Sequence, residues 1–322
     1  MRLNRNHYIL FGEETSLEIS WRTMNLSHAE QGTLIEALDK ARSKVFQRGD
    51  LPYISVERQL ELVEELSQFG LGRFVLERGG LNGYWTHYVV THPQQGLLTR
   101  LDAENKPFTA LESFILDQAP TSLATQERFQ IFKREIQKRL SNSMSLASVP
   151  CGLMADLLDL DFSQISGFSL CGIDIDPESI AQGQALARDR GLESRSSFLQ
   201  RDAWDLCCDG KFDLITSNGL SIYEPDNQKI VDLYRQFFFA LKPGGWLITS
   251  FLIPPPKWNA DRINPEHALL QRAIFSDILE AKWQIFRSEE LVKSQLLDAG
   301  FDEIEIIYDQ AHIFPTVIAR RI

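Results

Sequence analysis

The spacing of apolar residues changes near the middle of the chain. In the N-terminal third they recur every three to four positions, as at Leu34 and Leu38, which is the period of an amphipathic helix. From Ser145 onward, short apolar runs alternate with helical patterns, an arrangement typical of β-α-β units and a parallel sheet. The pattern therefore predicts a helical N-terminal domain, residues 1–123, and an α/β domain, residues 124–322.

The α/β half is expected to begin with an amphipathic helix and then to alternate strands with helices. Its tail indicates a helix that ends at Gly300, a strand, a turn and a last strand. Two strands joined by a turn pair antiparallel, so the predicted sheet is mostly parallel with an antiparallel C-terminal hairpin. The expected elements are the helix 124–140, the strands 146–149, 169–173, 197–200, 212–216 and 246–251, the helix 288–299, and the strands 304–308 and 313–319.

A long insertion, residues 253–286, follows the fifth predicted strand and contains an amphipathic helix near 265–279. An insertion at the carboxyl edge of a sheet is able to act as a lid over a ligand. The aromatic stretch Gly83-Tyr84-Trp85-Thr86-His87-Tyr88 is the N-terminal segment that we expect to face this lid across an apolar pocket. An equally good interpretation is that these aromatic residues pack between helices.

Composition excludes several classes of function. With 33 Lys and Arg against 44 Asp and Glu the net charge is -11, and such a surface repels the phosphates of nucleic acids. No stretch is long and apolar enough to span a membrane, and the start of the chain, residues 1–13, is too polar for a secretion signal. We therefore expect a cytoplasmic protein with no nucleic-acid partner. Its cysteines, Cys151, Cys171, Cys207 and Cys208, form no C-x-x-C pair, which indicates reduced thiols and no metal site.

Residues suited to ligand binding follow the first two predicted strands. The turn Pro150-Cys151-Gly152-Leu153-Met154 carries small residues that let backbone N–H groups approach a ligand, although a turn with one glycine is often only structural. Asp174 ends the second strand about 20 residues later, where a carboxylate is placed to accept both hydroxyls of a ribose. Asp176 directly precedes Pro177 and is assigned as the cap of the next helix, which leaves Asp174 for the ligand.

The third and fourth predicted strands are also followed by candidate ligand-binding residues. Asp202 and Ala203 follow the third, where a carboxylate can accept from an exocyclic amine. Asn218 and Gly219 end the fourth at the carboxyl edge of the sheet, where open α/β folds place their chemistry. The segment Leu241-Lys242-Pro243-Gly244-Gly245 is a helix stop followed by a tight turn, and we assign it a structural role.

In this order the segments resemble the class I S-adenosylmethionine-dependent methyltransferases over residues 124–322. The most specific part of the resemblance is Phe212-Asp213-Leu214-Ile215 followed by Leu241-Lys242-Pro243-Gly244-Gly245. The family's first loop usually carries an acid and about three glycines, whereas here Ser148 stands at the acid and only Gly152 remains of the glycines. A narrower, little-characterised bacterial group of small-molecule methyltransferases is similar in this loop. The resemblance implies a Rossmann-like α/β sheet with S-adenosylmethionine as cofactor and S-adenosylhomocysteine as product.

The same resemblance implies roles for individual residues. The first loop would line the methionine and ribose side of the cofactor, and the acid at the end of the second strand would hold the ribose. The residues after the third strand would face the adenine, and those after the fourth strand would border the sulfonium. The implied cofactor residues are Pro150, Cys151, Gly152 and Met154, then Asp174 and Ile175, then Asp202 and Ala203, then Asn218 and Gly219.

Three residues are candidates for contacting the methyl acceptor. Tyr223 and Glu224 follow the fourth strand, and His312 lies in the closing hairpin. Each also has a structural interpretation: Tyr223 as a packing residue, Glu224 on a solvated face and His312 in a turn. Because methyl transfer to a well-positioned acceptor does not need a strong base, catalytic residues leave a weak signal in the sequence.

These observations favour an enzyme that moves a methyl group to an oxygen or nitrogen of a small, hydrophobic acceptor. The alternative is a noncatalytic cofactor-binding or scaffold protein of the same fold, because the first loop has few glycines and no base is evident. A nicotinamide dehydrogenase is disfavoured, since no G-x-G-x-x-G follows the first strand. The absence of Asn-Pro-Pro-Tyr after the fourth strand argues against methylation of nucleobases or glutamine amides. No feature of the sequence indicates an oligomeric state.

Overall fold

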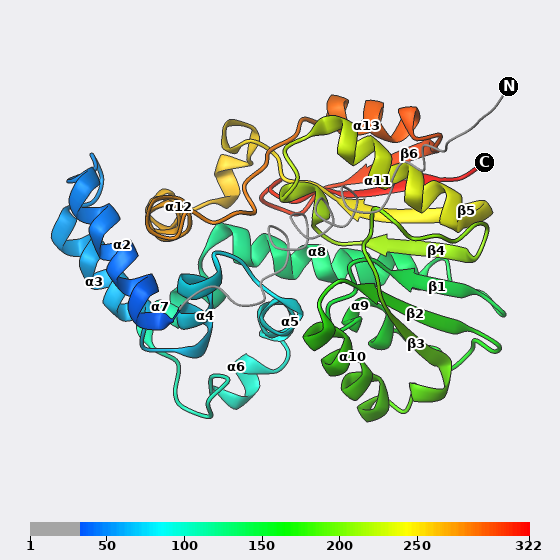
Figure 1. Ribbon diagram of the computed structural model, residues 1–322, viewed down its shortest axis with the longest axis horizontal. Helices are drawn as coiled ribbons and strands as arrows, with labels where there is room; N and C mark the ends of the chain where they lie inside the picture. Colours follow the sequence, from blue (N-terminus) through cyan, green and yellow to red (C-terminus); the bar gives the residue numbers. More distant parts are fainter. Residues whose placement is uncertain (1–32) are drawn as a thin grey trace, which may run out of the picture.

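A seven-stranded sheet forms the centre of the computed structural model, which describes residues 33–322 (Figure 1). The strands lie in the order β3-β2-β1-β4-β5-β7-β6, with β1 to β5 parallel and β7 antiparallel to both of its neighbours. This arrangement confirms the predicted fold class. The strands are β1 Ser145–Ser148, β2 Ser169–Asp174, β3 Ser196–Gln200, β4 Phe212–Ser217, β5 Leu241–Ser250, β6 Asp302–Ile307 and β7 Thr316–Arg320.

Helices cover both faces of the sheet, because successive side chains of a strand point to opposite sides. In β1, Leu146 packs with α8, α9 and α10, whereas the next residue, Ala147, packs with α11 and α13. Figure 1 shows these two helical layers on either side of the strands. The helices are α8 Pro120–Gln137, α9 Ala155–Leu158, α10 Pro177–Asp189, α11 Asn227–Ala240 and α13 Glu289–Asp298.

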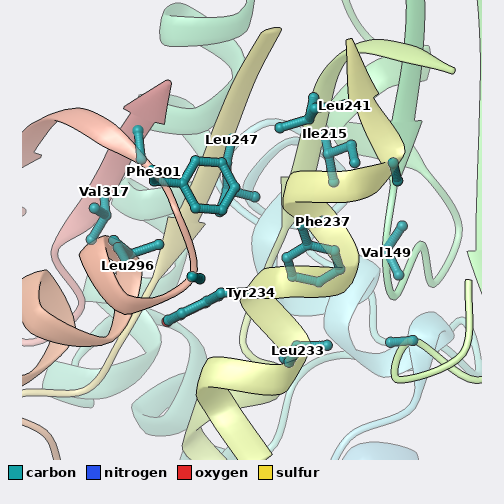
Figure 2. Close-up of a cluster of buried hydrophobic side chains, with 14 of the residues drawn as sticks. Val149, Ile215, Leu233, Tyr234, Phe237, Leu241, Leu247, Leu296, Phe301 and Val317 are labelled. Atoms are coloured by element: carbon teal, nitrogen blue, oxygen red, sulfur yellow. The ribbon is translucent and has the colours of Figure 1, made fainter. Parts of the chain in front are cut away.

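Each face of the sheet has an apolar core, and the larger of these two cores lies between the sheet and α11 (Figure 2). Phe237 and Tyr234 of α11 are almost completely buried there, together with Leu296 of α13. The strands contribute Ile215 and Leu247 to the same cluster. Such close packing of aromatic and aliphatic side chains holds the carboxyl ends of β1, β4 and β5 in fixed positions.

Two strand boundaries differ from the prediction. β5 begins at Leu241 instead of 246, because residues 242–245 form a bulge within it: Phe212 pairs with Leu241, and Leu214 with Trp246. The predicted tight turn is therefore part of a strand. β7 begins only at Thr316, since the backbone N–H groups of Ile313 and Phe314 donate to the carboxylate of Asp309 instead of to a neighbouring strand.

The N-terminal helices pack on one another and on the segment after β5. One core cluster joins Leu62 and Leu66 to Ala273, Ile274 and Ile278. The predicted helix near 265–279 is α12 followed by a π-helix. Residues 1–32 of the predicted helical domain lie outside the described residues. These elements are α2 Leu34–Arg48, α3 Val56–Leu66, α4 Gly70–Arg78, α5 Gly83–Thr91, α6 Gly96–Thr99, α7 Ala110–Asp117, α12 Pro265–Arg272 and the π-helix Ala273–Ile278.

Candidate functional site

A cavity lies at the carboxyl ends of β1, β2 and β4, between these strand ends and helix α5. The loops after four of the parallel strands line it, as do residues of α5 and Phe129 of α8. Parallel strands bring their carboxyl ends to one edge of a sheet, so loops far apart in the sequence meet there. The position agrees with the site expected from the sequence.

Most of the predicted site residues line this cavity, and three do not. Met154 ends the loop that follows β1, which we call the β1 loop, and its side chain is completely buried in the core. Glu224 is buried, its carboxylate accepts from the backbone N–H of Asp226 at 2.8 Å, and it orders the loop before α11. His312 lies in the turn between β6 and β7 with its ring 4.5 Å from that of Tyr308. The residues that do line the cavity are Pro150, Cys151, Gly152, Asp174, Ile175, Asp202, Ala203, Asn218, Gly219 and Tyr223.

Asp174 connects the end of β2 to the β1 loop. One of its carboxylate oxygens accepts from the backbone N–H of Gly152 at 2.8 Å, and the other accepts from that of Asp176 at 3.0 Å. The sequence predicted that this side chain is free for a ligand, whereas in the structure both of its oxygens already accept hydrogen bonds. Each oxygen keeps a lone pair for a further donor. Burial raises the pKa of Asp174 to about 6. This carboxylate orders the loop after β1 and also lines the cavity.

Asp176 has the capping role that the sequence predicted. Its carboxylate accepts from the backbone N–H groups of Glu178 and Ser179 at 3.1 and 3.3 Å, in the first turn of α10. Pro177 occupies the first helical position, where no N–H donor is needed. The start of α10 is thus fixed beside the cavity.

The end of β3 contributes a second acid. Asp202 accepts from the backbone N–H of Trp204 at 2.9 Å and lines the cavity together with Ala203. The indole N–H of Trp204 donates to the backbone carbonyl of Lys229 at 2.9 Å. This hydrogen bond fixes the aromatic ring that borders the cavity next to Asp202.

Asp156 is a site residue that the sequence analysis missed. It lies in the first turn of α9, is 6% exposed and lines the cavity. Its carboxylate accepts from the hydroxyl of Ser148 at 3.1 Å and from that of Thr216 at 2.5 Å. Burial raises the pKa of Asp156 above its usual value. The signal that could have revealed it is a lone carboxylate in the apolar run Met154-Ala155-Asp156-Leu157-Leu158.

Helix α5 approaches the β1 loop more closely than any side chain would allow. A Cβ atom on Gly83 would lie 2.8 Å from the Cα atom of Gly152 and 2.6 Å from the hydroxyl of Ser179. One helical turn further on, His87 lines the cavity with a buried Nδ1 atom that has no hydrogen-bond partner among the described residues. Burial lowers the pKa of His87, so the imidazole is neutral at pH 7.

Comparisons with known proteins agree with this architecture. Residues 151–245 match a family model described as a methyltransferase domain. The chain is similar to the crystal structure of a possible exported protein from Bordetella parapertussis, at 40% identity and a TM-score of 0.84, over 89% of this chain and 95% of that one. A search of curated proteins found no match.

Two further solved structures are similar at lower identity. One is a SAM-dependent methyltransferase from Methanosarcina mazei, at 20% identity and a TM-score of 0.42, over 58% of this chain and 97% of that one. The other is a geranyl diphosphate methyltransferase in complex with GPP and sinefungin, at 14% identity and a TM-score of 0.45, over 60% of this chain and 77% of that one.

The comparisons contradict the expected cytoplasmic location. The relative from Bordetella parapertussis, which is similar over 89% of this chain, is described as a possible exported protein. The expectation depended on the polarity of residues 1–13, which lie outside the described part of the structure. Within residues 33–322, no helix has the length and apolar character needed to cross a membrane.

Proposed function

We propose that this chain, a member of the class I S-adenosylmethionine-dependent methyltransferases, transfers a methyl group to an oxygen or nitrogen of a small, hydrophobic acceptor. S-adenosylmethionine is the cofactor, and when bound it supplies an electrophilic methyl group on a cationic sulfur. The protein's task is then to hold the cofactor, orient the acceptor and exclude water.

The residues around the cavity fit this cofactor. Asp174 offers carboxylate oxygens to the ribose hydroxyls, and Asp202 with Ala203 is suited to the adenine. Asn218 has a buried Oδ1 atom without a hydrogen-bond partner among the described residues, and an amide oxygen of this kind suits a cationic ligand. Gly219 has φ +96°, a backbone conformation that brings the chain close to a ligand without a side chain.

The observation that carries the acceptor proposal is the apolar wall beside Asn218. Leu81 and Leu220 line the cavity there together with Tyr223. Burial raises the pKa of Tyr223 above its ordinary value of 10.0. Its phenol therefore keeps its proton at neutral pH and serves as a hydrogen-bond donor rather than as a base. An apolar wall with one phenol suits a small hydrophobic acceptor with a single polar atom.

We assign the acceptor side to the N-terminal domain, residues 1–123, and the lid, residues 253–286, added to the methyltransferase domain, residues 124–322. Leu81 of the N-terminal domain lines the cavity. Trp258 and Trp283 of the lid pack in the same apolar cluster as Tyr223. Since the strand-end loops are occupied with the cofactor, acceptor selection falls to these added elements.

Calorimetry followed by an activity screen tests this function. We expect the purified protein to bind S-adenosylmethionine and S-adenosylhomocysteine, and to transfer a labelled methyl group to a member of a library of small hydroxy, carboxy and amino compounds. Tyr223→Phe should retain cofactor affinity and lose much of the transfer. Failure to bind either cofactor form would refute the proposal. Binding without transfer to any compound would favour the noncatalytic alternative, in which the fold only holds the cofactor.

A further inference from the structure

Asp156 is a buried carboxylate at the cavity wall without a cationic partner. Its two side-chain donors, Ser148 and Thr216, are neutral hydroxyl groups, and its other donors are the backbone N–H groups of Asp156 and Leu157. Among residues 33–322, no Lys, Arg or His nitrogen lies within 4.0 Å of its carboxylate oxygens. A buried carboxylate is costly unless a positive group or several donors compensate it. Asp156 is therefore poised for a cationic group that enters the cavity.

His87 lies at the same end of the cavity. Ala155, next to Asp156, packs in one apolar cluster with Val90, which is three positions after His87 on α5, and with Phe129. Contact between the start of α9 and the middle of α5 places both side chains at the wall formed by these two helices. The Nδ1 atom of His87 is buried and has no partner among the described residues. Asp159 and Arg190 are the charged groups that act on this imidazole.

This end of the cavity is separate from the end suited to a nucleoside. Ser148 and Thr216, which hold Asp156, end β1 and β4, whereas Asp202 follows β3. The order β3-β2-β1-β4 places β2 and β1 between β3 and β4. A nucleoside at Asp174 and Asp202 would therefore leave the other end of an elongated cofactor near Asp156.

We propose that Asp156 binds the ammonium group and His87 the carboxylate of the amino-acid end of S-adenosylmethionine, so that helix α5 completes the cofactor site. This inference rests on the proposed function. The amino-acid end carries one positive and one negative group. The cavity offers one carboxylate without a cation and one imidazole able to donate an N–H group. The close approach of Gly83 to Gly152 keeps α5 seated against the β1 loop, so His87 reaches the cofactor from outside the sheet.

Three ligands separate the two roles by calorimetry on the full chain. S-adenosylhomocysteine carries both groups, its decarboxylated analogue keeps only the ammonium group, and 5′-methylthioadenosine has neither. Asp156→Asn, which keeps the shape, should weaken binding of the first two at least tenfold and leave the third within about threefold. His87→Ala should weaken only S-adenosylhomocysteine, and His87→Gln, which restores an N–H donor, should recover part of the loss.

Asp202→Asn is the matched control, because a change at the adenine should weaken all three ligands alike. Thermal unfolding of each variant identifies any that fail to fold. Equal losses for all three ligands in Asp156→Asn and His87→Ala, or no loss in either variant, would overturn the inference. If the unaltered protein binds no S-adenosylhomocysteine, the proposed function itself fails. If the unaltered protein binds S-adenosylhomocysteine and the variants bind all three ligands with unchanged affinity, only this inference is rejected.

Discussion

The carboxylate of Asp174 joins two segments of the cavity wall. It accepts backbone N–H groups from the β1 loop and from the start of α10, and it faces the cavity. Replacing it with Ala would remove both the ligand contact and the tie to Gly152. We therefore interpret Asp174 as a binding residue that also orders the loop.

Cofactor binding should depend on pH through Asp174. Burial raises its pKa from 3.8 to about 6, and ribose hydroxyls donate more strongly to the ionised form than to the protonated form. Affinity for S-adenosylhomocysteine should then be constant above pH 7 and fall by up to about tenfold for each unit below 6. Calorimetry between pH 5 and 8 measures this.

Asp174→Asn is the control for the pH profile. It should bind more weakly at all pH values and lose most of the slope. An unchanged slope would assign the titration to another carboxyl group such as Asp156. The same shift has a defined sign for stability: the folded state holds its proton up to about pH 6 and the unfolded state only to about 3.8, so the free energy of unfolding falls as the pH rises through this window.

At the scale of single elements, α11 shows how an amphipathic helix divides its aromatic residues. Phe237 is fully buried between α11 and the sheet, whereas Phe239, two positions later, is 53% exposed. Phe237→Ala should lower the free energy of unfolding by about 3 to 5 kcal/mol, because it leaves a cavity in the core. Phe239→Ala should change it by less than about 1 kcal/mol. Urea denaturation measures both variants, and equal effects would contradict the packing described for this helix.

Helix α5 depends on a glycine at its first position. Gly83→Ala should destabilise the protein by about 1 to 3 kcal/mol, since its Cβ atom would collide with Gly152 and Ser179. By displacing α5, it should also weaken S-adenosylhomocysteine binding by about tenfold. Thermal unfolding and calorimetry measure the two effects.

Gly191 provides the comparison for this glycine. It has φ +67° and no neighbour within 4 Å of an added Cβ atom. Gly191→Ala should strain its backbone and reduce stability without changing ligand affinity. Loss of affinity in both variants would show that general destabilisation, rather than the position of α5, is responsible.

At the scale of the whole molecule, the N-terminal helices share a core with the insertion after β5, residues 253–286, which we propose as the lid. Ile274 of the π-helix is fully buried against the cluster that contains Leu62 and Leu66. Tyr53 and Asp277 also form a hydrogen bond across this contact. The insertion is therefore anchored at its helical part, where it packs on the N-terminal helices.

Ile274→Ala should lower the free energy of unfolding by about 2 to 4 kcal/mol. Because the cluster spans both segments, the loss should shift one unfolding transition instead of splitting it in two. Leu269→Ala in α12, where the side chain is 42% exposed, should have little effect. Calorimetric unfolding records both, and a separate early transition in Ile274→Ala would show that the lid unfolds by itself.

The predictions that succeeded from sequence depend on local patterns. Alternating apolar runs and helical periods identified the strands and the order of the elements, because burial of a face imposes its period on the chain. The same reasoning placed Asp174, Asp202 and Asn218 at one edge, since parallel strands bring their carboxyl ends together, and all three line the cavity. Their contacts with a cofactor stay predictions. Asp176 followed from its place before Pro177. The bulge at 242–245 was missed because its pairing involves two strands at once.

Long-range packing decided the rest of the site. Asp156 meets Thr216 across 60 positions of the chain, and Gly83 meets Ser179 across 96. The spacing of apolar residues along the sequence does not predict such contacts, because they arise only when separate elements bury their surfaces against one another. For the same reason Met154, Glu224 and His312, each next to a strand end in the sequence, lie away from the cavity: packing and hydrogen bonds turn their side chains elsewhere. The sequence by itself determined the sheet and its ligand-binding edge, and only the tertiary structure decided which side chains meet there.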